Sequence, residues 1–168
     1  MKPTLTMMIG IPGSGKSTWI RAMECDDLAV HRDDIRFSLL KDSDDYFARE
    51  DEVFELFVQK IINKMRGGMA IADATHMTKA SRKKLLTRLD QAFPNGYHTE
   101  MIVMNTSLKD CLYNNSLRSG RALVPSETIR NMYARLTIPS LDEHPSIIQI
   151  CCVTMRQQRG ESNDLGDF

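Results

Sequence analysis

The stretch Gly10-Ile11-Pro12-Gly13-Ser14-Gly15-Lys16-Ser17 follows directly after an apolar run at residues 5–9. It has the pattern Gly-x-x-x-x-Gly-Lys-Ser, which is typical of a phosphate-binding loop between a strand and a helix. Glycines let such a loop fold tightly around an anion, so that successive backbone N–H groups point inward. The alternative, a Gly-Pro turn before an ordinary helix, is disfavoured because a strand-like run precedes the loop and residues 18–20 can begin a helix. The stretch therefore predicts a site for a nucleoside triphosphate.

The polar positions of this loop have separate predicted roles. We expect Lys16 to reach the β- and γ-phosphates as a positive charge, and the Ser17 hydroxyl to bind Mg²⁺. The helix that follows directs the positive end of its dipole at the phosphates. ATP and Mg²⁺ are therefore the expected cofactors. The loop residues expected to bind ATP are Gly10, Pro12, Gly13, Ser14, Gly15, Lys16, Ser17 and Thr18.

Length and composition favour one cytoplasmic domain. The 168 residues are enough to bury a core, and we expect a single domain over 1–156 with a polar tail at 157–168. Because 22 Lys+Arg balance 22 Asp+Glu, a nucleic-acid partner has to bind at a local basic cleft. The four cysteines show no metal-binding spacing, and the short apolar run near the start predicts neither a signal peptide nor a membrane span. Nothing in the sequence predicts the oligomeric state.

Apolar runs alternate with stretches of helical periodicity along the chain. The predicted strands are residues 5–9, 28–30, 69–72, 97–105 and 147–153. The predicted helices are residues 15–23, 34–40, 46–65, 78–92 and 108–117, with another starting near 126. This alternation predicts an α/β fold with a parallel sheet of about five strands and helices on both faces. Ligands of such folds bind at the carboxyl ends of the strands, where the phosphate loop and Asp73 both fall.

A carboxylate and an arginine follow the second predicted strand. Asp33 and Arg36 are three positions apart at the start of a helix, so that they share a face. A carboxylate there is able to accept a hydroxyl proton, and the planar arginine is able to hold an anionic acceptor. The alternative is a helix-capping aspartate with a solvated arginine. Spacing alone does not choose between Asp33 and Asp34.

Asp73 ends the third predicted strand, a position at which P-loop proteins place an acidic residue that acts on Mg²⁺ directly or through its water. Alternatively, Asp73 orients Arg36 or Thr75. Thr75 and His76 are candidates for positioning the backbone near the acceptor, although a lone histidine is more often structural. Ser17 and Asp73 are thus the candidate metal ligands.

Residues 114–125 carry arginines in a short stretch between two predicted helices. Arg118 and Arg121, with Gly120 between them, are typical of a lid that places guanidinium groups on the transferred phosphoryl group and excludes water. The alternative is an exposed basic loop. A second basic run lies on the helix at 78–92 and predicts a solvated face, except for Arg82, which lies one turn beyond the Asp73 segment.

Taken together, these motifs resemble the kinase domain of the 5′-hydroxyl polynucleotide kinases of T-even bacteriophages and their P-loop kinase relatives. The similar pieces are 9–19, Arg32-Asp33-Asp34-Ile35-Arg36, Asp73-Ala74-Thr75-His76 with Arg82, 115–118 leading to 124–125, and 129–133. The pieces span most of the chain, from about residue 5 to residue 136. The phosphate loop is shared by many kinases, whereas the Arg-Asp-Asp-x-Arg block is much more specific.

The resemblance implies an ATP- and Mg²⁺-dependent kinase that phosphorylates the 5′-hydroxyl end of DNA or RNA during repair. By position it implies Asp33 as general base, Arg36 on the phosphate 3′ to the acceptor, and Arg118 in the lid, with Lys16 on the donor. The residues expected at the acceptor are Asp33, Arg36, Asp73, Thr75, His76 and Arg82, and those added to the ATP site are Arg118 and Arg121.

The chain departs from this family at two places. His76 stands where the family usually has asparagine, and Asn114 stands where the phage enzymes carry a further lid arginine. The spacing from that position to Pro125 also differs by one residue.

Two other functions remain open from the sequence. The first is a kinase for a small hydroxyl compound such as a nucleoside, an antibiotic or another metabolite, with which the neutral net charge is compatible. The second is a regulatory NTPase without an acceptor, in which Asp33 and Arg36 are packing or capping residues.

Overall fold

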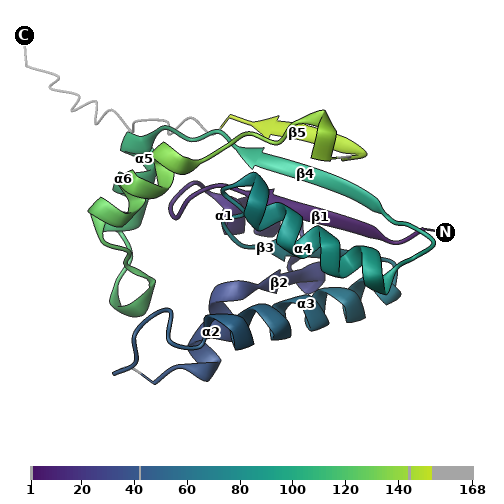
Figure 1. Cartoon of the computed structure of the whole chain (residues 1–168). Helices are drawn as coiled ribbons and strands as arrows, with labels where there is room; N and C mark the ends of the chain where they lie inside the picture. The colour runs from purple at the N-terminus through teal and green to yellow at the C-terminus, as the bar shows by residue number, and fades with distance from the viewer. Residues whose placement is uncertain (1, 42, 144, 153–168) are drawn as a thin grey trace, which may run out of the picture.

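The computed structural model describes residues 2–41, 43–143 and 145–152, and its centre is a five-stranded parallel sheet (Figure 1). The strand order is β2-β3-β1-β4-β5. The strands are β1 (Thr4–Ile9), β2 (Ala29–His31), β3 (Met69–Asp73), β4 (His98–Met104) and β5 (Ile147–Cys151). Since every pairing is parallel, all the carboxyl ends lie at one edge of the sheet. The predicted α/β fold with a parallel sheet is confirmed.

Helices cover both faces of this sheet. They are α1 (Lys16–Ala22), α2 (Arg32–Leu39), α3 (Glu50–Arg66), α4 (Lys79–Ala92), α5 (Leu108–Ser116) and α6 (Ser126–Arg135), with short 3₁₀ turns η1 (Asp26–Leu28), η2 (Gly120–Ala122) and η3 (Leu141–Glu143). In Figure 1, α3 and α4 lie in front of the sheet, α1 lies behind it, and α5 and α6 lie beyond the carboxyl end of β4. The carboxyl edge is therefore surrounded by α1, α2, α5 and α6.

The core has one cluster on each face of the sheet. On one face, the apolar stripe of α3 packs against alternate residues of the central strands, because apolar residues recur at helical spacing in α3 and at every second position in the strands. The members include Leu5, Met7, Ile9, Phe57, Val58, Ile61, Leu85, Met101 and Val103. On the other face, α1 packs through Ile20 and covers Met8, Ile71, Ile102 and Met104.

Two helix starts differ from the sequence prediction. Helix α2 begins at Arg32, before the predicted start near 34, so that Asp33 lies in the first helical turn. Helix α3 begins only at Glu50, and Tyr46 and Phe47 lie in turns before it rather than in a helix. The Asp45 carboxylate accepts a hydrogen bond from the backbone N–H of Phe47 (2.8 Å), and such local bonds compete with helix formation.

Within the described residues, no helix has the length and apolar character that spanning a membrane requires. The predicted polar tail at 157–168 lies outside the described residues.

Candidate active site

The phosphate loop lies at the carboxyl end of the central strand β1 and leads directly into α1. Gly15, the residue before the helix, has φ +96°, and Gly13 has φ +81°. A Cβ at Gly13 would lie 2.3 Å from the carbonyl oxygen of Cys111 in α5, so that only glycine fits there. The loop is therefore pressed against the first turn of α5.

Two side chains hold the loop in this shape. The Thr106 hydroxyl donates to the carbonyl of Ser14 (2.7 Å), and the Asn114 side-chain amide donates to the carbonyl of Gly13 (2.8 Å). The N–H of Gly10 donates to the Thr75 carbonyl (3.0 Å) and that of Ser14 to the Ile11 carbonyl (3.2 Å), so that the N–H groups of the remaining loop residues are the ones available to a ligand. Asn114, the position at which the phage kinases have an arginine, thus supports the loop.

Lys16 lies across the loop that it follows. Its ammonium donates to the carbonyls of Gly10 (2.9 Å) and Ile11 (3.2 Å). Burial lowers the pKa of Lys16, and the carboxylates of Asp73 and Asp33 partly offset this effect. The Ser14 hydroxyl is buried without a hydrogen-bond partner among the described residues. An unpaired buried hydroxyl beside a lysine and a glycine cradle fits a phosphate group.

Asp73, at the end of β3, joins the loop to β2. The Oδ2 atom accepts hydrogen bonds from the Ser17 hydroxyl (3.3 Å) and from Nδ1 of His31 (2.8 Å). Burial acts to raise the pKa of Asp73, but the hydrogen bond from His31 and the charge of Lys16 outweigh burial and lower it, so that the carboxylate is charged. A hydroxyl and a charged carboxylate placed together suit a hard cation such as Mg²⁺, which takes its other ligands from phosphate and water.

Two of the predicted acceptor residues, Asp33 and Arg36, lie in α2. Nη1 of Arg36 donates to Oδ1 of Asp33 (2.6 Å), so that the two side chains share a face of the helix as predicted. The charge of Asp33 acts on Lys16, which places this carboxylate near the phosphate loop. The side chain of Asp33 is 62% exposed, whereas that of Arg36 is 5% exposed.

Two residues that the sequence analysis missed complete this group. The Tyr46 hydroxyl donates to Oδ1 of Asp33 (2.9 Å), and Glu50 accepts from Nη2 of Arg36 (2.7 Å) and also pairs with Arg32. Burial acts to lower the pKa of Arg36, but the hydrogen bond to Glu50 and nearby negative charges outweigh burial and raise it. No sequence signal marks Tyr46 or Glu50, because the turn at 43–47 and the start of α3 meet α2 only in the folded chain.

The segment after Asp73 supports the loop mainly through its backbone. The Thr75 carbonyl accepts from the N–H of Gly10 (3.0 Å), and Nδ1 of His76 donates to the Met8 carbonyl (2.9 Å). His76 has φ +42°, a left-handed conformation in which asparagine is much commoner than most residues. Burial lowers the pKa of His76 to about 4, so that it is neutral at pH 7.

Arg82 is buried in α4 and its guanidinium is fully engaged. Nε and Nη2 donate to the two carboxylate oxygens of Glu143 (2.7 and 2.8 Å), and Nη1 donates to the carbonyls of His76 (3.0 Å) and Thr137 (3.0 Å). These bonds tie α4, the His76 segment and the chain around 137–143 into one unit. Arg82 is fully buried and supports the segment after Asp73 through its hydrogen bond to the His76 carbonyl.

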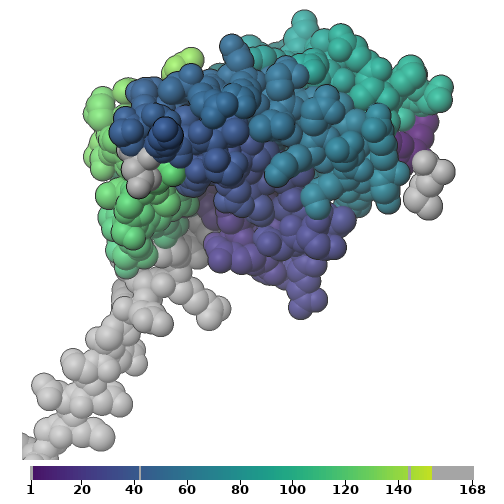
Figure 2. Space-filling view, turned by 90° about the horizontal axis from the view of Figure 1, so that it is seen from below, coloured from purple at the N-terminus to yellow at the C-terminus, as the bar shows by residue number. Residues whose placement is uncertain are grey.

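The predicted lid, residues 114–125, is held by hydrogen bonds at its base and at its tip. The Asn115 side chain exchanges two hydrogen bonds with the backbone of Val124 (2.8 and 3.1 Å), which closes the base. Arg121 donates to the carbonyls of Phe37 (3.4 Å) and Leu40 (3.1 Å) at the end of α2, and its guanidinium lies over the Phe37 ring. Figure 2 shows the blue segment around α2 beside the green segment that contains the lid and α6. Arg121 thus contacts α2 in this structure.

Arg118, the other lid arginine, is exposed, and its charge acts on Lys16 to lower the pKa of the lysine. Its place in a lid over the donor stays a prediction.

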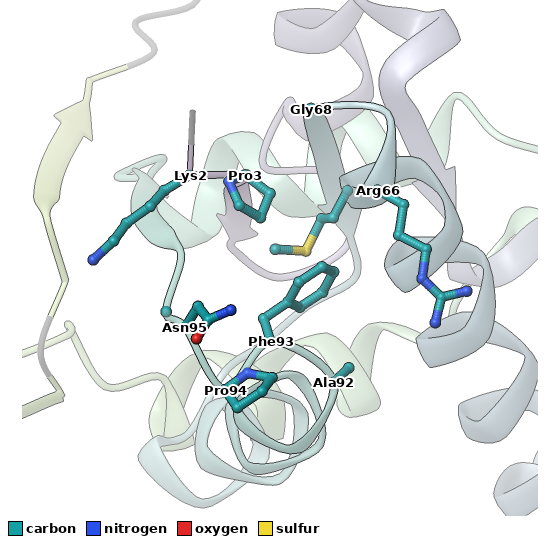
Figure 3. A pocket seen from close by; sticks show the side chains of 10 residues that line it. Lys2, Pro3, Arg66, Gly68, Ala92, Phe93, Pro94 and Asn95 are labelled. Atoms are coloured by element: carbon teal, nitrogen blue, oxygen red, sulfur yellow. The ribbon is translucent and has the colours of Figure 1, made fainter.

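A separate cavity of about 730 Å³ lies at the opposite, amino edge of the sheet. Its lining includes Pro3, Phe93 and Asn95, and Figure 3 shows the Phe93 ring near its centre, with the Lys2 and Arg66 side chains extending away from it on opposite sides. Because these residues precede β1, β3 and β4, the cavity is remote from the phosphate loop and contributes nothing to the candidate active site.

Comparison with known proteins places the chain among nucleotide-binding domains. A family model described as an AAA domain matches residues 5–139. No curated protein sequence gives a significant match.

Several solved structures share the fold. A putative kinase from Chloroflexus aurantiacus J-10-fl superimposes with a TM-score of 0.73 at 16% identity, covering 94% of this chain and 92% of that one. A sugar kinase from Janibacter sp. HTCC2649 gives 0.60 at 15% identity, with 90% and 86% covered. A fungal RNA kinase gives 0.62 at 13% identity and covers 94% of this chain, which spans 40% of that chain. At such identities the likeness establishes the fold, which is that of P-loop kinases.

Proposed function

The chain belongs to the AAA domain family, whose model it matches over residues 5–139, and on that premise we propose that it is an ATP-dependent kinase acting on a hydroxyl group. One observation carries the proposal. Asp33 lies in the first turn of α2, directly after β2, and therefore stands with the phosphate loop at the carboxyl edge of the sheet, where parallel α/β folds bind their ligands. A nucleotide-binding loop with a facing carboxylate is the minimum that phosphoryl transfer to an alcohol requires.

The donor side binds and orients ATP. In the proposed mechanism the loop N–H groups and Lys16 hold the phosphates, and Ser17 and Asp73 hold Mg²⁺, which neutralises phosphate charge when it is bound. The lid brings Arg118 to the same place and excludes water.

The acceptor side prepares the alcohol. Oδ1 of Asp33 is already bound by Arg36 and Tyr46, and Oδ2 has no hydrogen-bond partner among the described residues. Oδ2 takes the proton of the acceptor hydroxyl while that oxygen forms a bond to the γ-phosphorus and the bond to the ADP oxygen breaks. Asp33 is thus the proposed general base, with Asp34, whose exposed side chain makes no hydrogen bond or ion pair in the described part of the chain, as the weaker candidate.

We propose the 5′-hydroxyl end of a nucleic acid as the acceptor. The support is the Arg-Asp-Asp-x-Arg block at 32–36, which is the most specific part of the resemblance to polynucleotide kinases, together with the RNA kinase among the proteins of like fold. Thr75 is a candidate residue near the acceptor, whereas His76 and Arg82 are buried and support the segment that carries it. Arg36 is the candidate contact for the neighbouring phosphate.

One observation favours a small, uncharged hydroxyl compound instead. Both terminal nitrogens of Arg36 are engaged, one by Asp33 and Tyr46 and the other by Glu50. Because the Arg36 side chain is only 5% exposed, an acceptor phosphate competes with these partners for the guanidinium. A small alcohol meets no such competition, and the sugar kinase has the same fold.

An acceptor screen with γ-labelled ATP decides between these functions. Single-stranded DNA and RNA with 5′-hydroxyl ends are compared with the same strands carrying a 5′-phosphate, and with sugars, nucleosides and aminoglycosides. Label on the 5′-hydroxyl strands alone, with an acceptor KM that rises with salt, supports the polynucleotide acceptor. Label on a small compound alone contradicts it, and ATP hydrolysis without transfer to any acceptor contradicts the kinase proposal itself.

A further inference from the structure

Tyr46 contacts both charged residues of the acceptor side. Its hydroxyl donates to Oδ1 of Asp33 (2.9 Å) and accepts from Nη1 of Arg36 (2.8 Å). Its ring lies against the Arg36 guanidinium, at 4.2 Å from the ring centroid. The residue comes from the turn before α3, and the ring is held from the side by Phe37 and Phe47 in edge-on contacts. Tyr46 therefore fixes the geometry of two side chains of α2 from outside that helix.

Asp33 needs such a contact because it is otherwise poorly restrained. Its side chain is 62% exposed and lies in the first turn of α2, where a carboxylate can turn about its side-chain bonds. The contacts from Tyr46 and Arg36 converge on one oxygen, Oδ1, and leave Oδ2 for the acceptor. Without the second contact, the carboxylate is held by a single flexible partner, and the oxygen that faces the acceptor is no longer defined.

We propose that Tyr46 is a positioning residue for the proposed phosphoryl transfer: it orients Asp33 so that Oδ2 faces the acceptor hydroxyl, and it holds Arg36 beside it. This inference rests on the proposed function, because it assigns Asp33 the role of general base. Tyr46 itself touches neither the donor nor the transferred phosphoryl group.

The charges around Asp33 come from α2, the phosphate loop and α3. Arg36 contacts it from α2, Lys16 acts on it from the phosphate loop, and Arg32 acts on it from the start of α2. Glu50, from α3, neutralises part of the charge of the two arginines. Burial and then the charge of Asp33 raise the pKa of Tyr46, so that the phenol stays protonated and donates.

The test uses the full chain with Tyr46→Phe, which keeps the ring over Arg36 and removes only the hydroxyl. With the acceptor found in the screen, kcat falls about tenfold while the KM for ATP is unchanged, since a hydrogen bond to a charged group is lost on the acceptor side alone. Tyr46→Leu also removes the ring and lowers kcat further. Tyr97→Phe, which removes a hydroxyl that donates to the Asp90 carboxylate (3.0 Å) at the opposite edge of the sheet, is the matched control and stays close to wild type.

A second measurement does not depend on the acceptor. In carbon-detected NMR spectra at neutral pH, the signal of the Asp33 carboxyl carbon moves in Tyr46→Phe, which has lost the hydroxyl that contacts this carboxylate, and does not move in Tyr97→Phe. If the signal moves but no compound is phosphorylated, the contact stands and the proposed function fails. If phosphorylation occurs and neither the signal nor kcat changes in Tyr46→Phe, the positioning role is wrong.

Discussion

The donor and acceptor sides of the candidate active site are built in different ways. The donor side is one continuous loop whose backbone does most of the binding, held by glycine conformations and by bonds from Thr106 and Asn114 to loop carbonyls. The acceptor side is a network of charged side chains from α2, the turn at 43–47 and α3, in which Asp33, Arg36 and Glu50 pair with one another. The donor side is thus formed by neighbouring residues of one loop, whereas the acceptor side is formed by residues that come together only in the folded chain.

This difference has a consequence for specificity. A backbone nest recognises phosphate in any nucleotide, whereas a network of side chains can change its ligand when one member changes. The two sides therefore explain how proteins of one fold include a sugar kinase and an RNA kinase. Variants that alter only one side are the way to separate the two contributions.

The largest effect is expected on the acceptor side. Asp33→Asn removes the proposed base and lowers kcat by about a thousandfold, within the range of ~10²–10⁴ for general bases, and leaves ATP binding nearly intact. Asp34→Asn, at the next position and also exposed, keeps near-wild-type activity. Steady-state kinetics and ATP titration of both variants measure the contrast. Equal losses in the two variants would remove the distinction between the two aspartates.

The buried ion pair between Arg82 and Glu143 is expected to control the stability of the fold. Arg82→Leu leaves the Glu143 carboxylate, whose side chain is 4% exposed, without its partner, and removing one member of a buried ion pair costs about 3–5 kcal/mol of unfolding free energy. A fall in Tm of roughly 10 °C follows for a chain of this size. Arg88→Leu, a change in the same helix α4, breaks a more exposed pair with Glu55 of α3 and leaves Tm almost unchanged. Similar Tm values for the two variants would contradict the structural role of Arg82.

The donor side is expected to be sensitive to a single methyl group. Gly13→Ala places a Cβ against the Cys111 carbonyl and forces the loop away from α5, so that ATP binding weakens by on the order of a hundredfold. Gly120→Ala is the control for the strain of an alanine at positive φ. Gly120 also has positive φ (+59°), but no atom lies within 4 Å of its added Cβ, so that this variant adds strain without a clash. Calorimetric ATP titration compares them, and equal affinities would show that the packing of the loop is unimportant.

The smallest effect concerns acid stability. The pKa of His76 is lowered from 6.5 to about 4 by burial, so that the unfolded chain binds a proton between these values and the folded chain does not. Stability therefore falls as pH drops through 6.5 toward 4, by on the order of 2 kcal/mol between pH 7 and pH 5. His76→Asn keeps a residue suited to the left-handed conformation and removes this loss. Urea unfolding at both pH values measures it, and an equal acid loss in both proteins would exclude His76 as its source.

Much of the fold was predictable from local sequence. The five strands lie within one or two residues of their predicted positions because buried strands in a parallel sheet are short apolar runs bounded by polar or turn residues. The starts of α2 and α3 were placed less well. At 43–47 the sequence continues a helical apolar spacing through Tyr46 and Phe47, and only the turn formed by Asp45 ends it.

The sequence by itself determined the phosphate loop and its place after the first strand, because a backbone nest is a property of neighbouring residues and needs no distant partner. It also placed Asp33 and Arg36 on one helix face, since the helix period does so alone. Only the tertiary structure decided that Tyr46 and Glu50 join them, and that Glu143 holds Arg82 from 61 residues away. Those contacts depend on how α2, α3, α4 and the chain after α6 pack. The periodicity of apolar residues predicts which face of a helix is buried, but it does not predict which side chains of distant elements come into contact.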